Sequence, residues 1–399
     1  MAPKVLVLGS SFGGLTAALA LKSELHDEVE VSVISPSERF VFNPSLIWLP
    51  FGKRRAQDIS FPVGPTLEQH GVQFVHQAAT LIDPHTQTVH AGAAHPYDYL
   101  VIATGYRNDF SVAHGLGPNG DAVTITSLDD AIRAGERWQK LVDNPGPMVV
   151  MATQGASCFG AAYEFLFNAS YQVRRAKLAR QIPITFVTAE PFLGHFGIGG
   201  LPHGEKLLGM FLKKEKITAI TNASLEAVDA GVVVLSDGTT LASEYTMAIP
   251  PFMGQQVILD SGLGDARGYV KVRPTYQSEE YDNVYAVGIA AAVSAPWQTP
   301  TPVGVPKTGF PTEAMAHVAA TNIASQIRGE APHEEKEFKD IAAVCVMDAG
   351  NNGVVILADK MLPPRKHGIL VPGPQAHLMK LAFEKYFLWK MENGYVNLP

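Results

Sequence analysis

Cysteine is scarce in this chain, because only Cys158 and Cys345 occur among its 399 residues. Two cysteines are too few for a disulfide framework, and neither lies in a CxxC pair or in a cysteine–histidine spacing typical of zinc sites. We therefore expect neither a disulfide-stabilised fold nor a bound metal. The cysteines alone leave two interpretations open: two small buried apolar side chains, or a reactive pair.

An excess of basic residues and long apolar runs are missing as well. The net charge is -7, so there is no positive field to hold a phosphate backbone, and we expect no nucleic-acid partner. No run reaches the roughly 18 apolar residues that a membrane-spanning helix needs. The first residues enter a strand without the charged, apolar and cleavage regions of a signal peptide. Any membrane contact is therefore expected to be peripheral or monotopic, with the side of the membrane left open.

The chain begins with a strand, a glycine-containing turn, an amphipathic helix at 15–25 and a second strand, which form a βαβ unit. In the turn, Gly9 permits the tight bend and Gly14 the close packing of the helix, while Ser11 occupies the place of the second glycine. A βαβ turn without a ligand is the alternative. The candidate dinucleotide contacts of this unit are Gly9, Ser11, Phe12, Gly13, Gly14 and, where an acidic residue usually binds ribose, Ser35.

Two further strands end in glycine. Residues 97–105 end in Ala103, Thr104 and Gly105, and residues 283–288 end in Gly288. In this order the three motifs resemble the FAD contacts of the two-dinucleotide-domain flavoproteins, the glutathione reductase-like superfamily. The resemblance implies an α/β fold with two Rossmann-like domains, the first of which holds FAD. Ile289 replaces the usual aspartate after the last glycine, so we expect backbone groups and a helix dipole to make that contact.

A second βαβ-like unit is expected from about Gly146, with strands at 148–152, 184–188 and 232–236. Its first turn lacks the GxGxxG pattern of nicotinamide-nucleotide sites, because larger residues such as Gln154 stand where glycines are needed. Binding of NADH or NADPH is therefore disfavoured.

These units divide the chain into three predicted parts. Residues 1–110 and 246–330 form a discontinuous FAD-binding domain. Residues 111–245 form a degenerate nucleotide-binding-like domain. Residues 331–399 form a C-terminal membrane-associating region.

The turn of the second unit carries Cys158 directly before a helical pattern. A helix dipole and free backbone N–H groups at such a position are expected to lower the pKa of the thiol and favour the thiolate. Cys345 lies in the first of two apolar strands that follow residue 341. In a proline-rich loop at 297–308, Lys307 is the candidate cation for the pyrimidine edge of the flavin. A solvated loop lysine fits the sequence nearly as well.

The segment from His377 to Lys390 predicts a helix rich in aromatic residues, with further lysines at 380 and 385. This composition suits an amphipathic helix in a lipid headgroup layer, where aromatic side chains anchor it and lysines extend to the polar surface. An ordinary helix docked on the protein core is the alternative.

Four longer strings narrow the resemblance to one family: residues 155–160 (GASCFG), 190–195 (EPFLGH), 303–309 (VGVPKTG) and 382–387 (AFEKYF). With them, nearly the whole chain resembles the sulfide:quinone oxidoreductases, which are related to the flavoprotein of flavocytochrome c sulfide dehydrogenase. The resemblance implies sulfide as the substrate, Cys158 and Cys345 as a redox pair on one face of FAD, and a membrane quinone as the electron acceptor. It also makes a homo-oligomer possible.

Two positions depart from the family pattern. Thr126 stands where many bacterial members carry a third cysteine, which can hold the flavin covalently or take part in sulfur transfer. Asn43 stands at the covalent cysteine of the flavocytochrome branch. The FAD is therefore expected to be non-covalent.

Glu164 and His195 are the candidates for proton transfer, because sulfide oxidation and quinone reduction both move protons. A helix-surface carboxylate and a hydrogen-bonded loop histidine are the alternatives. Two other functions stay open for the chain. One is an enzyme like type II NADH:quinone oxidoreductase, which needs a working second glycine turn. The other is a non-catalytic flavin and thiol redox sensor.

Overall fold

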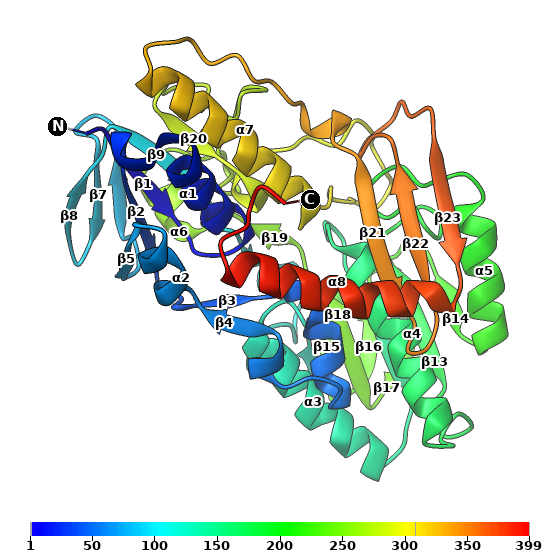
Figure 1. Cartoon of the computed structure of the whole chain (residues 1–399). Coiled ribbons are helices and arrows are strands. Elements are labelled where there is room, and N and C mark those ends of the chain that lie inside the picture. Colours follow the sequence, from blue (N-terminus) through cyan, green and yellow to red (C-terminus); the bar gives the residue numbers. More distant parts are fainter. Residues whose placement is uncertain (1, 308, 399) are drawn as a thin grey trace.

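The computed structural model describes residues 2–307 and 309–398, so Met1, Thr308 of the proline-rich loop and Pro399 lie outside the described residues. Two five-stranded parallel sheets form the centres of the two main parts of the chain (Figure 1). Their strand orders are β20-β9-β1-β2-β5 and β11-β18-β12-β13-β14. Parallel strands joined by helical crossovers confirm the predicted α/β architecture with two Rossmann-like sheets.

The strands of the first sheet are β1 (Lys4–Leu8), β2 (Glu30–Ser35), β5 (Gln73–His76), β9 (Tyr99–Ile102) and β20 (Val284–Ala286). Three neighbouring strands of this sheet, β1, β9 and β20, are buried and almost continuously apolar, whereas the edge strand β5 is partly exposed. The helix α1 (Phe12–Leu25) packs against α7 (Phe310–Ile327). For this reason α1 is buried almost all round, and the expectation that only one of its faces would be apolar was wrong.

The second sheet holds two of its three expected strands. It consists of β11 (Ala122–Val123), β12 (Met148–Ala152), β13 (Ile184–Thr188), β14 (Thr218–Ile220) and β18 (Tyr245–Ile249). Its helices are α3 (Leu128–Asp143), α4 (Phe159–Arg175) and α5 (Gly204–Glu215). The β18 strand pairs with β12 over residues 245–249, so the second sheet extends past residue 245, the predicted end of the second domain.

The third expected strand, at 232–236, was placed in the wrong sheet. It corresponds to β16 (Gly231–Leu235), which pairs antiparallel with β15 (Leu225–Asp229) and β17 (Thr240–Ser243). Short turns join these strands, including one through Gly238, and such turns allow only antiparallel pairing because a parallel connection needs a long crossover.

Smaller elements lie between the strands of the two sheets along the chain. They are β3 (Arg39–Val41), the 3-10 helix η2 (Asn43–Phe51), β4 (Ser60–Pro62), α2 (Val63–Gln69), β6 (Leu81–Asp83), β7 (Thr88–Ala91), β8 (Ala93–Pro96), β10 (Arg107–Asn108), β19 (Phe252–Met253) and α6 (Gln256–Asp260).

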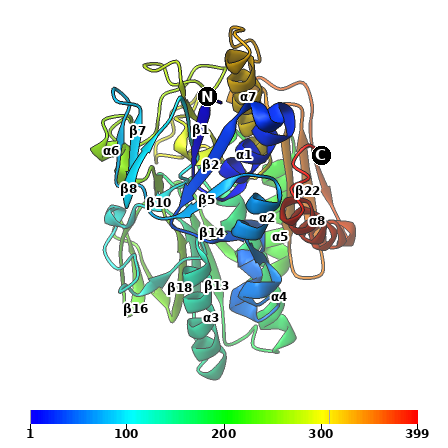
Figure 2. The same cartoon turned by 60° about the vertical axis from the view of Figure 1, so that its left-hand side comes forward.

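The C-terminal region forms an antiparallel sheet and a long helix. The strands are β21 (Ala343–Asp348), β22 (Gly353–Ala358) and β23 (Gly368–Pro372), and the helix is α8 (Pro374–Glu392). The α8 helix runs across the centre of the view in Figure 1, lies at the edge of the molecule in Figure 2, and packs against β21 and β22. Within the described ranges, no helix combines the length and the apolarity that crossing a membrane requires.

The lysines of α8 do not all extend to a surface as expected. Lys380 and Lys390 are buried and pair with Glu164 and Glu313 at 2.8 and 3.0 Å, while Lys385 is exposed. One face of α8 is thus docked on the core, as in the alternative interpretation. The outward face carries the exposed side chains of Leu378, Met379, Phe383 and Trp389.

Candidate functional site

The three predicted flavin motifs meet at one edge of the first sheet. Gly9, Gly105 and Gly288 follow β1, β9 and β20, which are neighbours in the sheet, so their carboxyl ends lie together. Ligands of open α/β sheets bind at this edge. The structure therefore gathers motifs that are separated by up to about 280 residues of chain.

The glycines of the first motif are required by close packing. Gly9 has a φ of 107°, and a Cβ there would lie 2.3 Å from the carbonyl oxygen of Ala103. A Cβ on Gly14 would lie 1.9 Å from the oxygen of Gly9, and one on Gly13 would lie 3.0 Å from Val287. Larger residues would push the α1 N-terminus away from the sheet, and with it the backbone N–H groups available to a phosphate.

The other predicted contacts of this unit differ in their surroundings. Ser11 is exposed at the N-cap of α1, and Phe12 is buried. Ser35 is also buried, and its Oγ lies 2.9 Å from Ser10 Oγ and accepts a hydrogen bond from the N–H of Ser37 at 3.1 Å. A contact between Ser35 and ribose stays a prediction.

Thr104 and Lys307 show features that fit a polar cofactor. The buried Oγ1 of Thr104 has no hydrogen-bond partner among the described residues, and such orphaned groups commonly face a ligand or water. A cavity of about 300 Å³ is lined by Tyr106, two residues after Thr104, and by Asn43 and Thr126 among others.

Lys307 is buried, so the solvated-loop interpretation was wrong. Its Nζ donates to the carbonyl oxygens of Ile289 and Ala291 at 2.9 and 2.5 Å and lies 4.0 Å from the centre of the Tyr269 ring. Burial lowers the pKa of Lys307 to about 7. The carbonyl groups of Ile289 and Ala291 hold the Lys307 ammonium beside the backbone that follows Gly288. The residues at this edge of the sheet therefore fit FAD.

The two cysteines are brought together as free thiols. Cys158 is the N-cap of α4, and Cys345 lies on β21. They lie close enough that the charge of Cys158 helps to raise the pKa of Cys345 to about 12, with burial as the main cause. Solvent reaches Cys345, yet the surrounding protein atoms leave its thiolate poorly hydrated.

The predicted lowering of the Cys158 pKa was wrong. Burial raises the pKa of this thiol, and the nearby Glu164 carboxylate acts in the same direction. The backbone N–H of Ala161 at the helix start and the ammonium of Lys380 oppose the rise without overcoming it. Desolvation therefore outweighs the helix N-terminus at this site.

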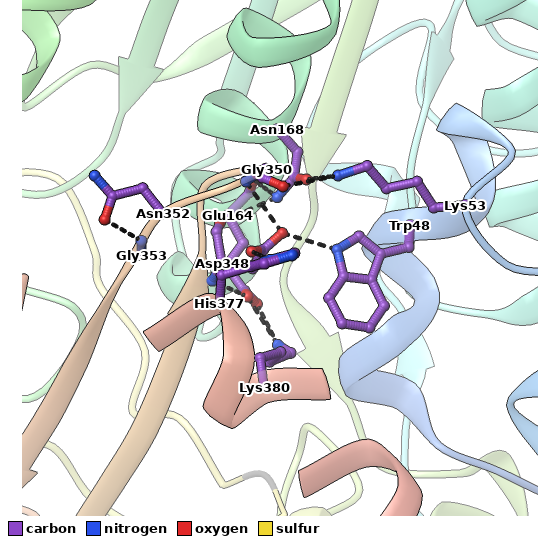
Figure 3. A network of polar contacts seen from close by, with 10 residues as sticks. All are labelled: Trp48, Lys53, Glu164, Asn168, Asp348, Gly350, Asn352, Gly353, His377 and Lys380. Atoms are coloured by element: carbon purple, nitrogen blue, oxygen red, sulfur yellow. Dashed lines mark hydrogen bonds and ion pairs between the residues drawn. The ribbon is translucent and has the colours of Figure 1, made fainter. Parts of the chain in front are cut away.

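Glu164 is at the centre of a buried network beside both thiols (Figure 3). Its carboxylate accepts hydrogen bonds from Lys380 Nζ at 2.8 and 3.0 Å and from the backbone N–H of Asp348 at 2.6 Å. Burial raises the pKa of Glu164, while Lys380 acts in the opposite direction. The surface-carboxylate alternative was therefore wrong, although proton transfer by Glu164 stays a prediction.

The same network fastens the helix of one cysteine to the strand of the other. Asn168 Nδ2 donates to the carbonyl oxygens of Glu164 on α4 and Asp348 on β21, both at 3.0 Å. The Asp348 carboxylate accepts from Trp48 Nε1 at 2.8 Å, and His377 Nδ1 lies 2.5 Å from its other oxygen (Figure 3). From the sequence alone, Asp348, Trp48 and His377 were not identified as members of the site. For Asp348 the available signal was a carboxylate three residues after a cysteine in an apolar strand.

His195 is buried beside Trp297, with ring centres 4.9 Å apart in an edge-on arrangement. Its Nδ1 has no hydrogen-bond partner among the described residues, so the interpretation as a hydrogen-bonded loop histidine was wrong for this atom. Burial lowers the pKa of His195 to about 4, and the positive charge of Arg365 adds to the effect. The ring is neutral at physiological pH, and its role in proton transfer stays a prediction.

The turn where a second nucleotide would bind is filled by the chain itself. The N–H of Gly155 donates to the oxygen of Pro302 at 2.7 Å, and the N–H of Gly304 donates to the oxygen of Ala156 at 2.8 Å. Backbone groups that would face a pyrophosphate are therefore already paired. The described residues contain no group of three or more His, Cys, Asp or Glu side chains arranged to hold a metal ion.

Known proteins share this architecture. Residues 3–161 match the family model described as pyridine nucleotide-disulphide oxidoreductase. The sulfide-quinone reductase of Aquifex aeolicus is 36% identical over 99% of this chain and 92% of its own length. The crystal structure of the sulfide:quinone oxidoreductase from that bacterium superimposes with a TM-score of 0.94 at 35% identity, over 98% of this chain and 92% of that one.

Type II NADH dehydrogenases are more distant. The type II NADH:quinone oxidoreductase of Staphylococcus haemolyticus is 21% identical over 97% of this chain and 96% of its own length. At that identity the similarity reflects a common fold. The identity and coverage of the Aquifex relative, together with the paired cysteines, show that this chain belongs to the sulfide:quinone oxidoreductase family.

Proposed function

We propose that this protein is an FAD-dependent sulfide:quinone oxidoreductase that oxidises sulfide to polysulfide or sulfane sulfur and passes two electrons to a quinone. The observation that carries the proposal is the placement of Cys158 and Cys345, the two cysteines of the chain, beside one buried carboxylate network. The 36% identity to the Aquifex sulfide-quinone reductase supports the substrate and the acceptor.

The thiol chemistry begins with a disulfide between Cys158 and Cys345. Hydrosulfide attacks one sulfur, the bond between the cysteines breaks, a persulfide forms on the attacked cysteine, and the other cysteine leaves as a thiolate. The proton of hydrosulfide passes to Glu164, whose carboxylate influences the pKa of both thiols. A second hydrosulfide removes the sulfane sulfur as polysulfide. The two cysteines are then thiols, and return to the disulfide releases two electrons. When bound, FAD would supply the acceptor for these two electrons and connect the oxidation to the quinone.

The residues around the flavin motifs hold the cofactor without a covalent bond. Thr126 offers a hydroxyl in place of a thiol, and this hydroxyl accepts from Asn108 Nδ2 at 2.8 Å and donates to Asp130 Oδ2 at 3.2 Å. Lys307, whose pKa burial lowers to about 7, supplies a cation when it is protonated, and this charge would stabilise negative charge on the flavin edge. His195 is the second proton-transfer candidate, acting as a neutral base.

Membrane association belongs to the same proposal. The exposed face of α8, formed by Leu378, Met379, Phe383 and Trp389, supports insertion of this helix into the headgroup layer, where a quinone would enter. The protein is then a peripheral or monotopic membrane protein. A homo-oligomer is part of the proposal, and light scattering of the detergent-solubilised protein tests it.

Steady-state reduction of a water-soluble quinone by sulfide tests the thiol mechanism. Cys158→Ser and Cys345→Ser should each lower turnover by about 10³-fold or more, because each change removes one partner of the S–S exchange. The flavin absorbance per chain should stay unchanged, which separates lost chemistry from lost cofactor. Undiminished turnover in either variant would contradict the mechanism.

A further inference from the structure

Glu190 occupies the place of a nucleotide-binding acid but faces the protein. It stands two residues after β13, the second strand of the second βαβ unit, where the carboxylate of a dinucleotide site binds ribose. Here the side chain is fully buried. Oε2 accepts from the hydroxyls of Tyr163 and Thr188 at 2.8 and 2.9 Å, and Oε1 accepts from the N–H of Phe196 at 2.7 Å. Within residues 2–307 and 309–398 this carboxylate forms no ion pair.

Those hydrogen bonds hold a loop whose backbone is unusual. In the loop 192–201, Phe196 has a φ of 55°, a region that non-glycine residues rarely adopt, and Gly194 and Gly197 also have positive φ values. The N–H of Gly194 donates to Tyr163 Oη at 3.0 Å, so Glu190 and Tyr163 together fix both sides of His195. A backbone in this conformation persists only when its surroundings determine it strongly.

The loop packs against the segment at Gly304, and this segment packs against the turn that carries Cys158. A Cβ on Gly197 would lie 2.3 Å from the oxygen of Gly304, and a Cβ on Gly304 would lie 2.8 Å from Ser157 Cβ. Ser157 directly precedes Cys158. Tyr163 itself lies on α4, the helix that begins after this cysteine. The path from the carboxylate to the thiol therefore runs through packed backbone and one buried helix.

We propose that Glu190 is a positioning residue, whose carboxylate holds the loop 192–201, with His195, and through the segment at Gly304 and Tyr163 on α4 fixes the turn that carries the Cys158 thiol. A carboxylate in the ribose-binding position thus organises the thiol site in place of a nicotinamide nucleotide. This rests on the proposed function only in taking Cys158 as a reactive thiol.

The test measures alkylation of Cys158 in the reduced, FAD-loaded protein, with Cys345 in the same sample as the internal reference. Glu190→Ala leaves three buried donors without an acceptor, so the loop should move and iodoacetamide should modify Cys158 about tenfold faster or more. Glu190→Gln keeps an acceptor for Phe196 and can turn its amide toward the two hydroxyls, so it should stay within about twofold of wild type. Glu226→Ala, at an exposed position of the same part of the chain, is the matched control.

Turnover with sulfide gives a second readout. Glu190→Ala should lower it by about 10- to 100-fold, because a displacement of about 1 Å has that effect on positioned groups, and Glu190→Gln should restore it. Tyr163→Phe keeps the carboxylate and should give an intermediate rise in the rate of Cys158 alkylation. This variant replaces Glu190→Ala in the test if Glu190→Ala does not fold. Equal Cys158 alkylation rates in wild type and in a folded Glu190→Ala or Tyr163→Phe variant would overturn the proposal. The alkylation rate does not depend on sulfide as substrate, so it stays informative if wild type shows no turnover.

Discussion

At the scale of single residues, desolvation controls the candidate site more than any local motif does. It raises the pKa of Cys158, Cys345 and Glu164 and lowers the pKa of His195. Each shift favours the neutral form of the group. A site of this kind stabilises charge only where a partner such as Lys380 is supplied.

The lowered pKa of His195 predicts a pH-dependent stability. The unfolded chain binds the proton near pH 6.5 and the folded protein only near pH 4, so the stability contributed by the neutral ring is complete above about pH 6.5 and is lost as the pH falls toward 4. His195→Gln should reduce this loss by up to about 3 kcal/mol. The free energy of urea unfolding at pH 7 and 4.5 measures the effect.

The exposed His90 provides the control for this experiment. His90→Gln should leave the pH dependence as in wild type. A His195→Gln variant with the wild-type slope between pH 7 and 4.5 would show that His195 is protonated equally in both states, contrary to its burial.

Much of the residue-level site was predictable, and the protonation was not. Gly9, Thr104 and the two cysteines were recognisable because turns, strand ends and thiols are encoded locally. The direction of the Cys158 shift depends on how completely β21 and α8 cover the turn, and these elements lie about 190 residues or more later in the chain. A helix N-terminus in the sequence does not reveal that covering.

At the scale of elements, α8 connects all parts of the site. It supplies Lys380 to Glu164, Lys390 to Glu313 on α7, and Glu384 to Arg54 after η2. Its buried residues recur at the spacing of one helix face, and its aromatic content obscured that pattern. Sequence reasoning identified the helix but assigned two of its lysines to the wrong surface.

Removal of the Lys380 charge should destabilise the protein strongly. Lys380→Met leaves the Glu164 carboxylate buried without a counter-ion, which costs about 3–5 kcal/mol of unfolding free energy. Adding Glu164→Gln removes the orphaned charge and still accepts from the N–H of Asp348, so the double variant should recover part of the loss. Thermal and denaturant unfolding of the FAD-loaded protein measure both changes.

Lys385→Met on the same helix is the matched control, because this exposed lysine should contribute less than about 1 kcal/mol. Similar losses for Lys380→Met and Lys385→Met would show that the buried ion pair does not hold α8 in place.

At the scale of the whole molecule, α8 lies outside the two parallel sheets and exposes the apolar side chains of its outward face. Replacing Leu378 and Trp389 on this surface by serine should weaken binding to lipid vesicles by about tenfold or more, because less apolar area enters the bilayer. Sedimentation with vesicles measures the bound fraction. Met210→Ser on α5 removes a side chain of similar exposure and should have little effect. Unchanged binding of the double variant would rule out α8 as the anchor.

The order of sheets and motifs was predictable because βαβ units have strong local patterns. The sheet to which β16 belongs was not predictable, since an apolar run of five residues does not determine which strand it pairs with. The closure of the second nucleotide turn by residues 302–304 also depends on a contact between distant segments. Only the absence of glycines from that turn indicated it.

The central claim is that sulfide, and not a nicotinamide nucleotide, reduces this flavoprotein. Anaerobic titration of the FAD-loaded protein with sulfide, and separately with NADH, while the flavin absorbance near 450 nm is recorded, tests it most directly. Full bleaching is expected at about two equivalents of sulfide, because one hydrosulfide forms the persulfide and a second removes its sulfane sulfur, and no bleaching is expected with NADH at the same concentration. Bleaching by NADH together with an unchanged spectrum in sulfide would contradict it.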